Sequence, residues 1–405
     1  MRFMDLKILS AALVLLLAAS ACGPLRSISP APTLPVATEP SVPVAASPTA
    51  LPPTLTALPP TPTSEPVAPA LTVASSPSIQ ILKMLDANNG WAVNNQAVLR
   101  TTDGGNTWFN ATPSGVSGLP GGSFFLDSAT GWVVLPGANF TSGTLYRTTD
   151  GGASWTSNTV PFAGASMQFL DPVNGWALAG LGAALSHEAV AVFRTSDGGV
   201  TWSQVFTDEP NAVNTSDTLP FVGDKTGLTV LDANHAWVTG SEPVSDFIYI
   251  YTTQDGGQTW SGQNPALPAG FAGAMTNAFP PRFFGASEGV LPVGVYADTS
   301  ARIMYLSHDA GQTWTASQPV PLNGQVSMTS ALDFFVWDGG AILYASHDGG
   351  TSWSTVTTNV NFPDELASFQ FVDPMTGWAV TSDAGSHYKL YKTVDGGITW
   401  NVQIP

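Results

Sequence analysis

The sequence predicts an all-β fold, a single seven-bladed β-propeller in which each blade is a four-stranded antiparallel sheet. Three observations predict it: one turn motif recurs seven times, alternating apolar residues precede its copies, and a second motif containing Gly-Trp lies upstream of most copies. Four-stranded units of this kind cannot bury both sheet faces alone, so we expect them to pack around an axis. An open stack of the same β-units is the alternative architecture.

The chain begins with a segment typical of a secretory signal. Residues 1–21 carry Arg2 and Lys7, followed by an apolar run that is too short to span a bilayer. Small residues then lead to Cys22, the only cysteine of the chain. This arrangement resembles a bacterial lipobox, which implies a lipidated Cys22 and a periplasmic or cell-surface location, with the membrane reached through the lipid alone. An ordinary signal peptide with an incidental cysteine is the alternative.

Residues 22–77 have the composition of a disordered tether. Between residues 23 and 77 there are 15 prolines, and the only charged residues are Arg26, Glu39 and Glu65. Such a segment cannot build a packed core and favours extended, partly polyproline-like chain. The propeller is therefore predicted to occupy residues 78–405.

The recurring turn motif, here called the box, is Thr/Ser-x-Asp-Gly/Ala-Gly-x-Thr/Ser-Trp. Its aspartates are Asp103, Asp150, Asp197, Asp255, Asp309, Asp348 and Asp395. Each aspartate can accept hydrogen bonds from the backbone amides of a tight turn, and the glycines that follow tolerate positive φ. The boxes are 39 to 58 residues apart, with the longest spacings around the fourth and fifth units. We expect each box to join the third and fourth strands of a blade.

The second motif, Asp-x3-Gly-Trp, is clearest at Asp86 to Trp91, Asp127 to Trp132, Asp171 to Trp176 and Asp373 to Trp378. It predicts a turn between the first and second strands. In an antiparallel blade these turns and the boxes share one face of the ring, and the remaining loops share the other. The first unit starts with an inner strand and the last ends with an outer one, so the sequence does not predict how the ring closes.

The boxes resemble the Asp-box, or BNR, repeat of bacterial neuraminidases. The pairing of a Gly-Trp strand with a box most closely resembles the photosystem II stability and assembly factor group, over residues 78–405. That resemblance implies an extracytoplasmic propeller that holds protein partners during assembly. We therefore expect a lipid-anchored, monomeric, non-catalytic scaffold for protein binding or complex assembly, without a cofactor. The alternative is a cell-surface glycan-binding protein or a glycoside hydrolase of the Asp-box class, with polysaccharide as its partner.

The residues offer little support for catalysis. The resemblance to sialidases would require three converging arginines, but Arg100, Arg147 and Arg194 occupy one equivalent repeat position and cannot converge, which leaves Arg282 and Arg302. Glycoside hydrolysis needs two carboxylates about 5 to 10 Å apart. Candidates are Asp208, Glu209, Asp217, Glu242, Asp246, Glu288 and Asp298. Because the chain has 29 acidic residues, such pairs are expected by chance, and we predict that the protein is not an enzyme.

Composition bears on other ligands as well. The net charge of -17 argues against nucleic acid, which binds basic surfaces. All 13 tryptophans belong to the two motifs, so they are expected in the core rather than on a sugar-binding platform. The five histidines lack the spacing of a metal site, and none is predicted.

Partner contacts are expected in long segments outside the repeat pattern, on the face opposite the boxes. These segments are 179–190, 208–224, 240–247, 264–282 and 295–301. Charged and aromatic residues within them have no evident structural role. The candidate partner-binding residues are Asp208, Glu209, Glu242, Asp246, Arg282 and Tyr296.

Overall fold

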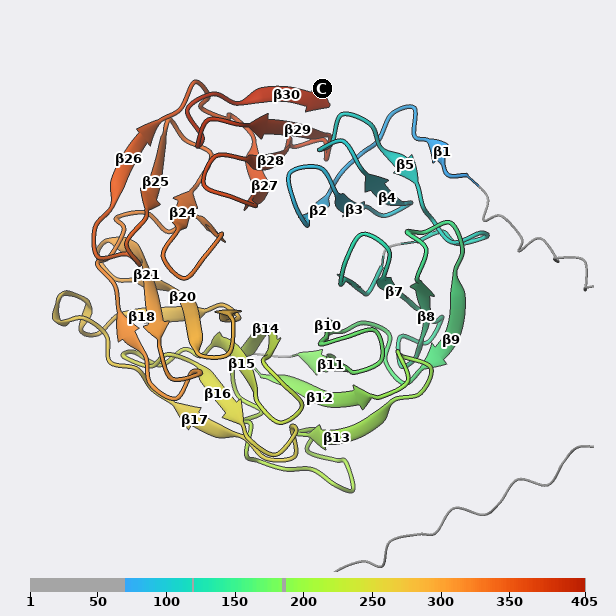
Figure 1. The fold of residues 1–405 in the computed structure, drawn as a ribbon. Helices are drawn as coiled ribbons and strands as arrows, with labels where there is room; N and C mark the ends of the chain where they lie inside the picture. Colours follow the sequence, from blue (N-terminus) through green and yellow to red (C-terminus); the bar gives the residue numbers. More distant parts are fainter. Residues whose placement is uncertain (1–69, 119, 184–186, 405) are drawn as a thin grey trace, which may run out of the picture. The chain divides into compact units, whose positions relative to one another are not determined.

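The protein is a seven-bladed β-propeller. In the computed structural model, which describes residues 70–118, 120–183 and 187–404, seven antiparallel sheets stand in a ring (Figure 1). The predicted fold class is thereby confirmed. The predicted signal peptide, Cys22 and the tether up to residue 69 lie outside the described residues. No helix in the described part of the chain is long and apolar enough to cross a bilayer.

The first three blades run from the ring axis outward in chain order. Blade one contains β2 (Ile81–Met84), β3 (Gly90–Val93), β4 (Val98–Thr101) and β5 (Phe109–Asn110). Blade two contains β6 (Gly122–Phe125), β7 (Gly131–Pro136), β8 (Gly143–Thr148) and β9 (Thr156–Val160). Blade three contains β10 (Ser166–Phe169), β11 (Gly175–Ala183), β12 (Glu188–Thr195) and β13 (Ser203–Thr207).

The remaining blades repeat this order, with one irregular first strand in blade five. Blade four contains β14 (Asp224–Val230), β15 (Ala236–Ser241), β16 (Ile250–Thr253) and β17 (Ser261–Gln263). A short 3₁₀ turn, η1 (Ala269–Phe271), precedes blade five. Blade five contains β18 (Met275–Ala278), β19 (Arg282–Phe284), β20 (Glu288–Tyr296), β21 (Ser300–Ser307) and β22 (Thr315–Ala316). Blade six contains β23 (Gln325–Met328), β24 (Phe334–Trp337), β25 (Ile342–Ser346) and β26 (Ser354–Thr357). Blade seven contains β27 (Glu365–Phe371), β28 (Gly377–Ser382), β29 (Tyr388–Thr393) and β30 (Asn401–Ile404).

Each box is a hydrogen-bonded turn between the third and fourth strands, as predicted. In the first box, Asp103 Oδ1 accepts hydrogen bonds from the backbone N of Thr107 at 2.8 Å and from Thr101 Oγ1 at 2.9 Å. Gly104, at φ 72°, donates its N–H to Asn88 O in the turn between β2 and β3. The box and the first turn of the blade therefore share one face of the ring.

Acid is expected to weaken the boxes. Hydrogen bonds from Thr313 lower the pKa of Asp309 to about 2, and hydrogen bonds from Ser352 do the same for Asp348. A carboxylate with a depressed folded-state pKa stabilises the fold above its unfolded pKa, about 3.9, and loses that contribution as pH falls toward about 2. We expect the thermal midpoint of unfolding, followed by circular dichroism, to fall between pH 4 and pH 2. Asp309→Asn should show a smaller fall, and a midpoint unchanged across this range would contradict the expectation.

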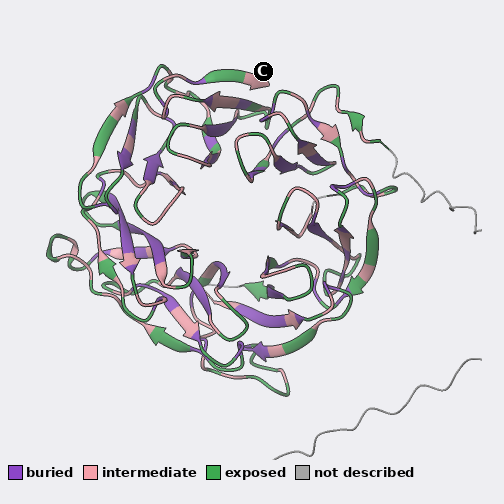
Figure 2. Cartoon of the chain, viewed as in Figure 1, coloured by how far each residue is buried: buried purple, intermediate pink, exposed green. Residues whose placement is uncertain are grey.

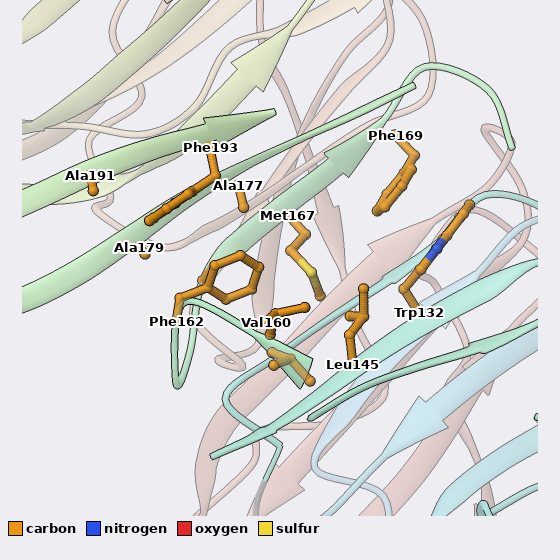
Figure 3. Close-up of a cluster of buried hydrophobic side chains, with 12 residues drawn as sticks. Trp132, Leu145, Val160, Phe162, Met167, Phe169, Ala177, Ala179, Ala191 and Phe193 are labelled. Atoms are coloured by element: carbon orange, nitrogen blue, oxygen red, sulfur yellow. The ribbon is translucent and has the colours of Figure 1, made fainter. Parts of the chain in front are cut away.

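Apolar residues between neighbouring blades form the core. Figure 3 shows the cluster between blades two and three, where the rings of Trp132 and Phe169 stack with centroids 3.7 Å apart. A Cβ at Gly175 would come within 2.5 Å of Phe169, which explains the glycine of the Gly-Trp motif. Burial is greatest in the second strand of each blade and lowest in the fourth strand, at the outer edge of the ring (Figure 2). The predicted packing role of the motif tryptophans is thus observed here.

The repeated basic residue before each of four boxes ties its blade to the next one. Arg147 lies over Trp132, with its Cζ 5.7 Å from the ring centroid, and donates to Pro172 O at 2.9 Å. Arg100, Arg194 and Lys392 also lie over a tryptophan of their own blade, and each donates to a glycine carbonyl in the box of the following blade. These side chains are therefore structural, and the three arginines do not converge on a ligand.

The ring closes by packing blade seven against blade one, without a shared blade. The side chain of Gln370 on β27 both accepts a hydrogen bond from Met84 N at 2.9 Å and donates one to Met84 O at 2.6 Å. An additional strand, β1 (Thr72–Val73), pairs with β5 on the outside of blade one. Because β1 lies within the predicted tether, the folded part of the chain begins before residue 78.

Candidate binding site between blades five and six

The candidate site arises where the first strand of blade five is interrupted. Both β18 and β19 pair with β20, and Pro280 and Pro281 lie in the gap between them. Proline has no N–H to donate, so it cannot continue the ladder. A pocket of about 500 Å³ lies beside this gap, against blade six. It is lined by Phe279, Pro280, Pro292, Arg302, Asn323, Gly324, Gln325, Val326 and Met328.

Arg302 is the one charged residue in the pocket wall, and it is only 5% exposed. Its Nη2 donates to Gly324 O at 2.7 Å, and its Cζ lies 4.8 Å from the ring centroid of Phe279. Its Nε and Nη1 are buried and have no hydrogen-bond partner within residues 70–118, 120–183 and 187–404. Burial lowers the pKa of Arg302 to about 10, so the guanidinium is charged at neutral pH. The pocket therefore holds a buried cation with unused donors.

Asn323 brings an unused acceptor to the same place. Its Oδ1 is buried, and no residue in the described part of the chain donates a hydrogen bond to it. A Cβ built at Gly294 would lie 2.9 Å from Asn323 Oδ1 and 3.2 Å from Arg302 Nη1, so both groups face the bare backbone of Gly294. Unpaired buried polar groups are uncommon and costly. Donor and acceptor together mark this pocket as the best candidate for ligand binding among the described residues.

Further positive charge lies near the pocket. Arg282 on β19 donates through Nη1 to Met328 O, and Met328 lines the pocket. Lys83 lies on the first strand of blade one and is exposed along its length. The protein around its amine displaces part of the water there, which lowers the pKa of Lys83, and the positive charge of Arg282 lowers it further. Among the ion pairs of the described residues, none includes Lys83, Arg282 or Arg302.

Asp208, predicted to contact a partner, lies in the interior instead. It is 4% exposed, its Oδ2 is 3.6 Å from Lys225 Nζ, and its Oδ1 accepts a hydrogen bond from Val190 N at 2.6 Å. The carboxylate therefore joins blade three to the start of blade four. In the sequence, Asp208 stood out as a charge outside the repeat pattern. In the structure, this charge belongs to an ion pair between two blades.

The other predicted contact residues are distributed over blades three to five. Glu209, Asp246 and Tyr296 are exposed, and Glu242 is half-buried directly after β15. Asp246 accepts a hydrogen bond from Gly273 N at 2.7 Å and so fastens one long loop to another. Arg282, described above, donates a hydrogen bond to Met328 of the pocket, and Tyr296 interacts electrostatically with Arg302 of the pocket. Arg302 and Asn323 were not among the predicted contacts, although the Pro280-Pro281 pair inside the expected segment 264–282 was a signal of irregular chain.

Several of the expected loops are strands. Residues 179–183 and 188–190 extend the hairpin of β11 and β12, and 295–296 with 300–301 extend the hairpin of β20 and β21. Apolar residues continue through both hairpins. The two strands of each hairpin therefore stay paired over more residues than the strands of most other blades. In the described residues, histidine, aspartate and glutamate side chains form no group of three that could hold a metal ion.

Fold and pocket together define a seven-bladed β-propeller with a candidate ligand site between two blades. No protein-family model matches the chain. Among curated proteins it is similar to a xyloglucanase from Paenibacillus sp., at 28% identity over 267 residues, which cover 56% of this chain and 24% of that protein. The chain thus spans about a quarter of the length of this relative.

Two solved structures show the same fold. The structure of YCF48 bound to D1 peptide is 18% identical, with a TM-score of 0.52, and the match covers 80% of this chain and 99% of that one. The GH74 xyloglucanase from Xanthomonas campestris is 14% identical, with a TM-score of 0.55, and the match covers 83% of this chain and 55% of that one.

These similarities correct one prediction from the sequence. We expected that the chain is not an enzyme, but the similarity to the Paenibacillus xyloglucanase contradicts this expectation. The expectation rested on two arguments. The chain contains a single propeller, and pairs of carboxylates are expected by chance in so acidic a sequence. Neither argument excludes an activity whose residues lie in loops between the repeats.

Proposed function

We propose that the chain is an extracytoplasmic, lipid-anchored propeller that recognises a protein partner, with the pocket between blades five and six as the anchor point. The observation that carries this proposal is the buried guanidinium of Arg302, whose Nε and Nη1 have no acceptor among the described residues. The pocket wall is otherwise mainly apolar and contains no carboxylate. Such a combination suits a polypeptide group with an apolar body and a single polar end. YCF48, which shares the fold, has been solved with a D1 peptide.

The test is co-purification of the full-length protein from its native membranes, with quantitative mass spectrometry of what it retains. We expect a protein partner in stoichiometric amount with the wild type, and a loss of at least about tenfold with Arg302→Met. Lys389→Met removes an exposed positive charge from blade seven and should retain the partner. Cys22→Ser should move the protein from the membrane to the soluble fraction. No retained protein, or equal retention by Arg302→Met, would contradict the proposal.

A second candidate function is hydrolysis of a polysaccharide of the xyloglucan type, favoured by the 28% identity to the Paenibacillus enzyme. The chemistry would need two carboxylates across a sugar-binding cleft. Exposed carboxylates are available at Glu209, Asp217, Asp246 and Asp298. The test is release of reducing ends from xyloglucan by the purified protein. Activity that is lost on replacing a carboxylate with its amide would establish this function, and absence of release would remove it.

A further inference from the structure

We propose that the pocket between blades five and six binds the C-terminal residue of a polypeptide, through its carboxylate and its backbone N–H. This inference rests on the proposed function, since it specifies the part of the partner that enters the pocket.

The unpaired groups require a ligand that both accepts and donates. Arg302 offers Nε–H and Nη1–H without acceptors, and Asn323 offers Oδ1 without a donor. Both side chains face Gly294, which brings them into one neighbourhood. The C-terminal residue of a polypeptide carries a carboxylate, and its backbone N–H is attached to the same Cα. Of the groups in a polypeptide, the last residue therefore matches this pair of side chains most directly.

The charge favours a carboxylate over a phosphate monoester, which carries close to two negative charges. Arg302 is a single cation, it is 5% exposed, and no carboxylate of the described residues pairs with it. Transfer of an ion into such a site is favourable only when its charge is compensated there. A carboxylate brings one negative charge to one positive charge, and charge-assisted hydrogen bonds to a guanidinium are among the strongest in proteins. A doubly charged group would need a second cation in the pocket wall, where Arg302 is the one charged residue among the described residues.

The walls accommodate an apolar side chain. The pocket of about 500 Å³ is lined by the rings of Phe279, Pro280 and Pro292 and by the side chains of Val326 and Met328. Methionine adapts to ligands of different shape, whereas the proline rings are rigid. We therefore expect the last residue of the partner to be apolar, such as leucine, isoleucine or phenylalanine. A neutral sugar would find too few polar groups for its hydroxyls.

Isothermal titration calorimetry of the full-length protein with N-acetyl-leucine tests the inference. A ligand of this size is expected to bind with a Kd on the order of 1 mM. N-acetyl-leucinamide, which lacks the charge, should bind at least about tenfold more weakly, and 4-methylpentanoate, which keeps the charge but lacks the N–H, several-fold more weakly. Equal binding of the acid and the amide, or no binding of the acid, would overturn the proposal.

Variants locate the binding in this pocket. Arg302→Met should reduce the affinity for N-acetyl-leucine at least about tenfold, and Lys389→Met should leave it unchanged. Gly294→Ala keeps every charge but places a Cβ 2.9 Å from Asn323 Oδ1, so it should also block binding, even if Arg302→Met proves unstable. Affinity unaffected by Gly294→Ala would place the ligand elsewhere and overturn the assignment.

The two proposals fail separately. If N-acetyl-leucine binds through Arg302 but no protein co-purifies, the carboxylate site stands and the protein-binding function fails. If a protein co-purifies equally with wild type and Gly294→Ala, recognition of a protein stands and the carboxylate site fails.

Discussion

Replacing Trp378 with alanine is expected to lower the free energy of unfolding by about 3 to 5 kcal/mol, because the side chain fills the joint that closes the ring. Trp378 is fully buried and packs in one cluster with Leu82, Met84 and Trp108 of blade one. Its Nε1 donates to Gly104 O, in the box of blade one, at 3.0 Å. Alanine would leave a cavity and an unpaired carbonyl at the contact between the two ends of the propeller. A typical domain has a stability of only about 5 to 15 kcal/mol.

Equilibrium unfolding in urea, followed by tryptophan fluorescence and circular dichroism, measures this loss. Trp132→Ala is the matched variant, since Trp132 is equally buried in blade two and donates to Gly198 O at 2.8 Å in blade three. Similar losses would mean that the closing joint is packed like the internal ones. Met375→Ala, at a position 53% exposed in blade seven, should change the stability by less than about 0.5 kcal/mol. A loss below about 1 kcal/mol in Trp378→Ala would show that ring closure does not depend on this joint.

Replacing Lys225 with methionine is the second change with a large expected effect, a loss of about 3 to 5 kcal/mol. Lys225 and Asp208 have side chains that are 0% and 1% exposed, with Nζ and Oδ2 3.6 Å apart. Nζ also donates to Glu188 O and Pro220 O, both at 2.8 Å. Burial, the largest cause, raises the pKa of Asp208 and lowers the pKa of Lys225. Without its amine, Asp208 would be a buried carboxylate with no counter-charge.

The sign of the pH dependence separates this cause from a general packing defect. A buried carboxyl with a raised pKa is tolerated when protonated and becomes costly as pH rises. The loss in Lys225→Met should therefore be largest near pH 7 and shrink toward pH 4. Addition of Asp208→Asn should recover part of it, whereas Lys389→Met should have little effect. A loss that is independent of pH and of Asp208→Asn would contradict the ion-pair explanation.

The local architecture of this protein could be predicted from the sequence because it is encoded in short motifs. Asp103 and Gly104 specify a turn by their own hydrogen bonding and backbone preferences, and seven such turns specify seven blades. The Gly-Trp motif encodes a close contact between neighbouring strands. These interactions join residues that are close in sequence or that occupy a fixed place in the repeat. One chain therefore contains seven independent examples of the same turn.

The closure and the pocket could not be predicted because they depend on contacts between distant residues. Trp378 donates to Gly104 across the two ends of the chain, and nothing in either motif distinguishes that pair from the other blades. Asp208 lies outside the repeat pattern, which predicts a charge on the surface, but its ion pair with Lys225 lies in the interior. Arg302 on β21 lines the pocket together with Phe279 and Pro280, which lie in the gap between β18 and β19 on the other side of β20.

Site-specific photo-cross-linking in the native membrane tests most directly whether the pocket between blades five and six is where the partner binds. A diazirine amino acid would replace Met328 in the pocket wall in one variant and Phe140, which is 75% exposed in blade two, in the other. The proposed function predicts that illumination gives a discrete protein adduct from position 328 and none from position 140. An adduct from position 140 alone, or equal adducts from both positions, would contradict it.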